Sequence, residues 1–195
     1  MVRDLIISDL HFGHGGVISG CNRPFRDVTQ MNKEMIRRWN YVVRPQDRVF
    51  YLGDFIWGDI EAGKEIRKAL NGQIIFIMGN HDKNQTRVRS MGFDEVFDFY
   101  VYYHKNITYY MSHYPYAPPL FNRIKAKFLG QEIKFLNRRV PKPRQKNIWL
   151  LHGHVHNTWG KINRKEQMIN ISADVWNFTP VTIKNQIREL VWNTV

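Results

Sequence analysis

Cysteine is almost absent from this chain, which has 195 residues and a single cysteine, Cys21. One cysteine cannot form a disulfide within the chain, and a chain without disulfides is typical of a reducing compartment. No apolar run approaches the roughly 20 residues that are needed to span a bilayer. The apolar run near the N-terminus is short and interrupted by charge, which argues against a secretory signal. We therefore expect a cytoplasmic protein with no membrane partner.

Internal repeats and low-complexity tracts are also absent, and the length fits one domain over residues 1–195. Acidic residues are scarce, because 17 Asp and Glu stand against 29 Lys and Arg, a formal net charge of +12. This balance favours polyanionic partners, although a solvated basic surface would explain it too. The excess gathers in an expected insertion at about 121–147, since residues 122–147 hold nine basic residues and one acid, Glu132.

Short apolar runs of strand length recur along the chain, and each of them ends in polar residues. Near-continuous apolarity indicates strands that are covered on both faces of a sheet. The runs and the polar groups that follow them are Leu5–Ile7 with Ser8–His11, Val49–Leu52 with Gly53-Asp54, Ile74–Met78 with Gly79–Asp82, Ile107–Met111 with Ser112-His113, and Ile148–Leu151 with His152–His156.

Apolar residues at helical spacing separate the early strands. They predict helices over Thr29–Tyr41 and Ile60–Leu70, and a closing helix over Ile183–Val191. The stretch Val101–Tyr110 reads as strand and turn. Strands and helices alternate first and strands dominate later, which predicts a four-layer α-β-β-α sandwich of two mixed sheets flanked by helices. We expect a metal site at the strand ends, where such sheets bind ligands.

The polar residues at the strand ends are oxygen and imidazole donors. Asp9 and His11 are two residues apart, so on an extended chain both would point to the same side. The same argument applies to His154 and His156. Carboxylates and imidazoles suit Mn, Fe, Ni or Zn better than Ca, and we assign no cysteine to the set.

Five ordered motifs carry a specific resemblance to a known family. They are Asp9-Leu10-His11, Gly53-Asp54, Gly79-Asn80-His81-Asp82, His113 and Gly153-His154-Val155-His156. In order and approximate spacing they resemble the calcineurin-like metallophosphoesterase superfamily over residues 9–156. The blocks 8–14, 22–25 and 174–177 further resemble a subgroup of small single-domain bacterial and phage phosphoesterases. The second motif continues as Phe55-Ile56-Trp57-Gly58 and lacks the Asp-Arg-Gly of the protein-phosphatase branch, which argues against a phosphoprotein phosphatase.

The resemblance implies two divalent metal ions, with manganese as the first choice and iron, nickel or zinc as alternatives. One ion would be held by Asp9, His11, Asp54 and His156, and the other by Asp54, Asn80, His113 and His154. Hydroxide bound between the two ions would attack the phosphorus of a phosphate ester. His81 would donate a proton to the leaving oxygen, and Asp82 would orient His81 if residues 80–82 form a turn.

Substrate contacts are expected from basic residues and from one further histidine. His14 and Arg23 lie in the subgroup blocks, while Arg138 and Arg139 lie in the basic insertion, and arginine suits phosphate. His152 would either orient a metal-bound imidazole or lie outside the site. The basic insertion favours a phosphodiesterase that acts on nucleotides or nucleic acid. The alternatives are a phosphomonoesterase acting on a small phosphorylated metabolite or nucleotide, and a non-catalytic interaction scaffold of the same fold.

Replacing Arg138, Arg139, Lys142 and Arg144 with neutral residues is predicted to raise KM for a polyanionic substrate and to flatten its salt dependence. Such charge contacts are screened over about 8 Å at physiological ionic strength. Hydrolysis of a small nitrophenyl phosphate would barely change, because its chemistry depends on the metals. Steady-state kinetics at several salt concentrations measure both effects. Equal KM values for wild type and variant, over several nucleotides and oligonucleotides, would favour the metabolite phosphatase.

Overall fold

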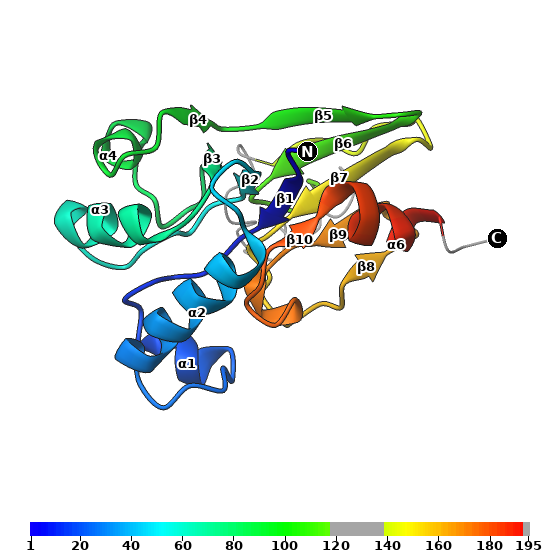
Figure 1. Cartoon of the computed structure of the whole chain (residues 1–195). Helices are drawn as coiled ribbons and strands as arrows, with labels where there is room; N and C mark the ends of the chain where they lie inside the picture. Colours follow the sequence, from blue (N-terminus) through cyan, green and yellow to red (C-terminus); the bar gives the residue numbers. More distant parts are fainter. Residues whose placement is uncertain (118–138, 193–195) are drawn as a thin grey trace.

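The computed structural model describes residues 1–117 and 139–192 (Figure 1). Most of the basic insertion expected at about 121–147, including Arg138, lies outside the described residues. None of the described helices is both long and apolar enough to cross a membrane. The fold consists of two five-stranded mixed sheets with flanking helices, which confirms the expected α/β sandwich.

The first sheet has the strand order β10-β1-β2-β3-β4. Its strands are Asp4–Ile7 (β1), Arg48–Tyr51 (β2), Gln73–Ile77 (β3), Glu95–Phe97 (β4) and Val181–Thr182 (β10). The strands β1 to β4 are parallel, and β10 pairs antiparallel with β1. Because the central strands are parallel and mostly buried, their carboxyl ends meet at one edge of the sheet.

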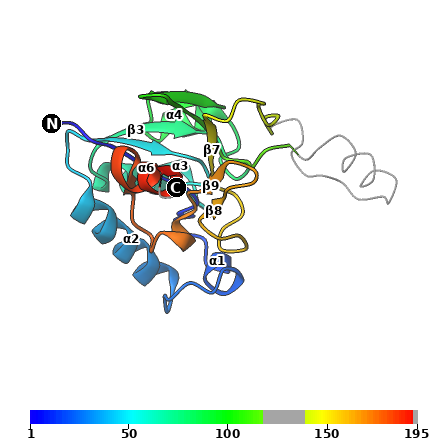
Figure 2. The ribbon, with the colours of Figure 1, turned by 90° about the vertical axis from the view of Figure 1, so that its right-hand side faces the viewer.

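The second sheet has the strand order β5-β6-β7-β9-β8. Its strands are Tyr100–His104 (β5), Ile107–Ser112 (β6), Ile148–His152 (β7), Ile162–Asn163 (β8) and Met168–Asn170 (β9). The strands β6, β7 and β9 are parallel, and Figure 2 shows β7, β9 and β8 side by side. Ser112 lies opposite His152, so the segments that follow β6 and β7 leave the sheet at the same level.

The helices described before β4 pack against one face of the first sheet. They are Gly16–Gly20 (α1), Val28–Val42 (α2), Ile60–Ala69 (α3) and Gln85–Ser90 (α4). Capping aspartates begin α2 and α3, because Asp27 and Asp59 accept hydrogen bonds from the first turns of these helices. The short turn Ala173–Val175 (η2) follows β9, and Ile183–Ile187 (η3) continues into Arg188–Trp192 (α6).

Two apolar cores occupy the two faces of the first sheet. Leu5 of β1 packs with Trp39 of α2 in one core, while its neighbour Ile6 packs with Tyr109 and Leu151 of the second sheet in the other. Alternate residues of a strand face opposite sides, so β1 contributes to both cores. Burial of both faces fixes the position of one sheet against the other. It thereby fixes how far apart the strand ends of the two sheets lie.

Candidate metal centre

The carboxyl ends of five strands from both sheets converge on one cluster of polar side chains. Asp9 follows β1, Asp54 follows β2 and Asn80 follows β3, while His113 and His154 follow β6 and β7. All the expected metal ligands lie in this cluster. The prediction of a site at the strand ends therefore agrees with the geometry.

Left-handed backbone carries five of the seven expected ligands. The φ angles are 58° at Asp9, 52° at His11, 60° at Asp54, 71° at His154 and 48° at His156. Residues other than glycine rarely adopt this region, which costs about 1–2 kcal/mol per residue. The extended-chain argument for the two donor pairs is therefore wrong, because both strands end before the first member of each pair. The pairs reach the cluster on turns instead.

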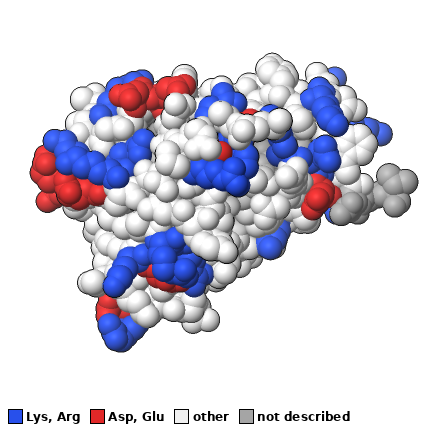
Figure 3. All heavy atoms as spheres, in the orientation of Figure 1, with Lys and Arg blue, Asp and Glu red and all other residues white. Residues whose placement is uncertain are grey.

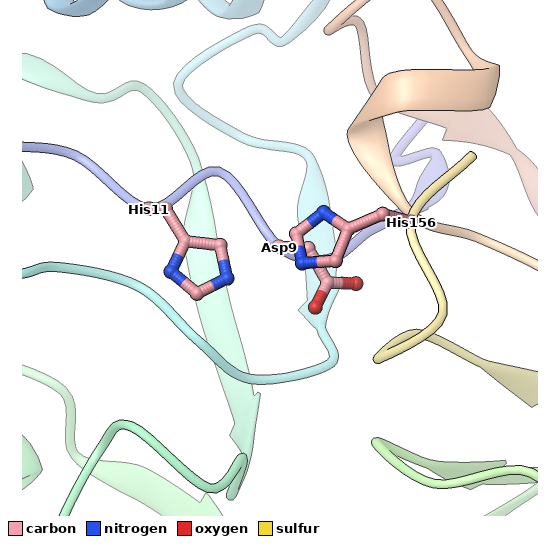
Figure 4. A group of neighbouring side chains, drawn as sticks. All are labelled: Asp9, His11 and His156. Atoms are coloured by element: carbon pink, nitrogen blue, oxygen red, sulfur yellow. The ribbon is translucent and has the colours of Figure 1, made fainter. Parts of the chain in front are cut away.

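Asp9, His11 and His156 form one group that could hold a metal ion, with their ligand atoms all within 4.8 Å of one another. Figure 4 shows the imidazole of His156 beside the carboxylate of Asp9, and His11 farther along the same segment as Asp9. His11 Nε2 is buried and has no hydrogen-bond partner among the described residues. A buried polar atom without a partner requires an explanation, and coordination to a metal ion supplies one.

Asp54 lies between the two halves of the cluster. Its Oδ2 is 3.4 Å from His11 Nε2 and 3.5 Å from His113 Nε2. Asp9, Asp54 and His113 form a second group of possible metal ligands within 4.8 Å. Asn80 Oδ1 lies 3.0 Å from His113 Nε2 and 2.9 Å from His154 Nδ1. Asp9 belongs to both groups, and Asp54 Oδ2 lies near one imidazole of each, so either carboxylate lies between the two sets of donors.

The charges in the cluster decide its protonation. Burial alone raises the pKa of Asp9. The imidazoles of His113, His156 and His11 nevertheless hold that pKa below its ordinary value. Burial raises the pKa of Asp54 to about 6, and it lowers the pKa of His11 to about 2 and that of His154 to about 4. His11 and His154 are therefore neutral near pH 7, which is the form of imidazole that binds a metal.

Glycines allow the loops to approach the carboxylates closely. A Cβ at Gly79 would lie 2.3 Å from Asp54 Oδ1, and a Cβ at Gly153 would lie 2.3 Å from Asp9 Oδ2. A side chain at either position would displace a carboxylate from the cluster. The close approach, the nitrogen and oxygen donors and a buried His11 Nε2 without a hydrogen bond among the described residues together fit a divalent metal ion.

Arg23 has a different role from the substrate contact that the sequence suggested. Its side chain is fully buried and pairs with Asp174 through Nε and Oδ1 at 2.8 Å. The same guanidinium donates to the carbonyl oxygens of Asp9 and Leu10 at 2.7 Å each. A guanidinium that is buried and occupied in this way is not available to a substrate phosphate. Arg23 instead holds the turn that presents Asp9.

Asp82 also differs from its expected role. Its buried carboxylate accepts hydrogen bonds from the backbone N–H groups of Asp54 at 2.8 Å, Phe55 at 3.0 Å and Gly79 at 2.7 Å. Both carboxylate oxygens are therefore occupied by the loops after β2 and β3, and Asp82 does not orient His81. The imidazole of His81 lies near Asp54, with Nε2 3.9 Å from Oδ2, and its side chain is 37% exposed.

The remaining candidates lie at the border of the cluster. The ring centroid of His14 is 5.5 Å from that of His11 and 6.3 Å from that of His81. Arg139 is half-buried, and its Nε has no hydrogen-bond partner within the described part of the chain. His152 is buried, and its Nδ1 pairs with the carbonyl oxygen of Gly153 at 2.9 Å. His152 therefore supports the turn before His154.

Two residues near His156 received no role from the sequence. Asp174 Oδ2 lies 2.8 Å from His156 Nδ1, which leaves Nε2 of His156 available to a metal ion. Cys21, His156 and Asp174 form a third group within 4.8 Å, so the cysteine that we set apart lies beside the site. Burial alone would lower the pKa of His156, but hydrogen bonds with Asp174 and Cys21 raise it to about 10, so a metal ion at Nε2 would displace a proton. The sequence signal that could have pointed to Asp174 was the resemblance of the block 174–177 to the phosphoesterase subgroup.

Comparisons with known proteins agree with this geometry. A family model described as calcineurin-like phosphoesterase matches residues 3–184. The chain is 36% identical over 189 residues to an uncharacterized protein of Methanocaldococcus jannaschii, a match that covers 94% of this chain and 88% of that one. A solved structure of a protein of unknown function from Aquifex aeolicus is 28% identical with a TM-score of 0.69, covering 97% of this chain and 100% of that one.

The chain belongs to the calcineurin-like phosphoesterase family, as its motifs predicted. It is accordingly a metal-dependent phosphoesterase, a hydrolase that acts on phosphate esters.

Asp174→Asn is predicted to weaken metal binding by about ten- to a hundredfold, because the carboxylate orients His156 and anchors Arg23. Calorimetric titration of metal-free protein with Mn²⁺, at a temperature where the variant is folded, measures the change. Asp94→Asn is the matched control, since Asp94 is exposed and precedes β4, whereas the cluster follows the carboxyl ends of the strands. Equal affinities for wild type and Asp174→Asn would contradict the positioning role.

Asp82→Ala is predicted to lower the free energy of unfolding by about 3 kcal/mol or more, because each buried N–H that loses its acceptor costs about 1–3 kcal/mol. Chemical denaturation of the metal-free proteins measures the loss, with Asp94→Ala as the control. Unchanged stability together with slower turnover would restore the catalytic role that the sequence suggested for Asp82.

Proposed function

We propose that this protein is a two-metal phosphodiesterase that acts on nucleotides or nucleic acid. The observation that carries the proposal is the location of Asp54 Oδ2, 3.4 Å from His11 Nε2 and 3.5 Å from His113 Nε2. A carboxylate has two oxygens with several lone pairs, so two metal ions can share it. Two donor groups around one shared carboxylate suit the paired ions of phosphoryl-transfer enzymes.

The proposed ligand sets are those implied by the motifs. One ion would be held by Asp9, His11, Asp54 and His156, and the second by Asp54, Asn80, His113 and His154. Nitrogen and oxygen donors suit manganese, with iron, nickel or zinc as alternatives. When bound, the ions would supply positive charge for the phosphoryl oxygens and would lower the pKa of a coordinated water.

His81 would act as the general acid. Its backbone N–H donates to Asp54 Oδ1 at 2.9 Å, which holds the residue beside the cluster. Its side chain is 37% exposed and belongs to none of the possible metal-ligand groups among the described residues. The imidazole can therefore reach a bound ester from the solvent side. A proton held there would pass to the leaving oxygen as the bond from phosphorus to that oxygen breaks.

The choice of a nucleotide or nucleic acid rests on charge. The net charge is +12, and Figure 3 shows Lys and Arg in several groups over one face, with acidic side chains among them. Lys142 pairs with Glu166 at 3.1 Å, whereas Arg139 Nε has no partner among the described residues. Arg139 is a candidate for a phosphate contact because arginine suits phosphate, although its Nε is buried. His14 stays a second candidate for a phosphate contact. The cytoplasmic location of the protein stays a prediction.

Metal analysis is predicted to find about two divalent ions per chain, with Mn, Ni or Fe supporting hydrolysis and chelators abolishing it. Elemental analysis of the loaded protein gives the metal content. Assays with mono- and bis-nitrophenyl phosphate, run side by side, give the activity and the preference between monoester and diester. Full hydrolysis by metal-free protein would contradict the proposal.

His81→Ala is predicted to slow turnover by roughly a hundredfold or more while leaving the metal content nearly intact. The loss should shrink for esters with good leaving groups, which need little protonation. Asp54→Ala is the comparison, because it should lose metal. Loss of metal from His81→Ala, with retention by Asp54→Ala, would show that the two roles are assigned wrongly.

A further inference from the structure

Trp57 is a large apolar side chain at the rim of the metal centre, with 55% of its surface exposed. Its indole stacks on the imidazole of His14, with ring centroids 4.5 Å apart and an interplanar angle of 13°. The ring centroid of His81 lies 5.5 Å from the same indole. Single exposed hydrophobic residues are common and need no explanation by themselves. The contact of Trp57 with His81, the proposed general acid, places this exposed indole beside the reaction.

The backbone on either side of Trp57 is held in place. Its N–H donates to the carbonyl oxygen of Phe12 at 2.7 Å, and Phe12 pairs with Ile56 in a parallel bridge. Gly13, with φ at 77°, lets the carbonyl of Trp57 approach so closely that a Cβ at position 13 would lie 2.6 Å from its oxygen. Arg87 donates a hydrogen bond to the carbonyl oxygen of Gly58. The exposed indole is therefore carried by an anchored turn.

We propose that Trp57 is a stacking platform for the base of the nucleoside that leaves during hydrolysis. The inference rests on the proposed function, because His81 marks the side of the phosphorus on which the leaving group lies. His14 stacks on one face of the indole, and 55% of the Trp57 surface remains exposed, which is area that a flat ring could cover. A base that stacks on an aromatic side chain gains about ten- to a hundredfold in affinity.

A nucleobase suits this surface better than a sugar or an alkyl group. Two flat rings, those of His14 and Trp57, already stack in parallel, and a base would extend that stack by one ring. The net charge of +12 also favours a nucleotide chain with several phosphates over a sugar that carries one. Every base has a π face, so the platform would accept purines and pyrimidines with little preference.

Two dinucleotides test the platform. The first is complete, and the second carries an abasic residue in place of the nucleoside that leaves. The wild type should cleave the complete dinucleotide with a kcat/KM about tenfold higher. Trp57→Ala should cleave both at the abasic rate, and Trp57→Phe should keep most of the difference. Trp192→Ala is the matched control, because Trp192 is 51% exposed in α6. This variant should keep the whole difference in kcat/KM between the two dinucleotides. A preference that survives in Trp57→Ala, or an equal loss on both dinucleotides, would overturn the inference.

A binding experiment on metal-free protein separates this inference from the proposed function. The indole N–H signal of Trp57 in an NMR spectrum is assigned by its loss in Trp57→Phe. Adenosine should shift this signal saturably, and ribose 5-phosphate should leave it unchanged. Absence of hydrolysis of any phosphate ester would refute the proposed function, while a shift with adenosine would still support the platform. No shift with adenosine, or an equal shift with ribose 5-phosphate, would overturn it.

Discussion

Left-handed backbone at the residues that follow the strands is the constraint on which the site depends. An extended chain would carry the donors away from the neighbouring strand ends, whereas a left-handed residue turns the chain back across them. Hydrogen bonds between loops offset the conformational cost. Asp9 N–H donates to the carbonyl of Gly53 at 3.0 Å, His11 N–H donates to that of Asp54 at 3.1 Å, and His154 N–H donates to the carboxylate of Asp9. Each bond joins two donor loops, so the loops hold one another.

Carboxylates perform two distinct tasks around these turns. Asp82 and Asp174 use their oxygens to hold backbone N–H groups, Arg23 and His156, whereas Asp54 keeps Oδ2 near two imidazoles. Buried charges are stable only when they are paired and hydrogen-bonded, and the supporting carboxylates meet that condition. Asp9 and Asp54 are two carboxylates in a cluster that an added cation would stabilise. The supporting contacts are internal, while His81 and Trp57 face the solvent from which a substrate arrives.

The five ordered motifs predicted the family, and the apolar runs with polar endings predicted the two mixed sheets, because both patterns are properties of adjacent residues. The helices expected over Thr29–Tyr41 and Ile60–Leu70 end within one residue of α2 and α3. Short elements such as α1 and β10 were missed, since five or two residues carry no readable period. Arg23 and Asp82 were misassigned for another reason. Their partners depend on long-range packing, as Arg23 and Asp174 are 151 residues apart in the chain.

The site chemistry that we propose depends on two metal ions that share the carboxylate of Asp54. Electron paramagnetic resonance of protein saturated with Mn²⁺ tests it directly, because two manganese ions held about 3.5–4 Å apart by a common ligand are magnetically coupled. Shared coordination by Asp54 predicts a coupled spectrum for the wild type and the spectrum of isolated ions for Asp54→Ala. A spectrum of isolated ions from the fully loaded wild type would show that Asp54 is not shared.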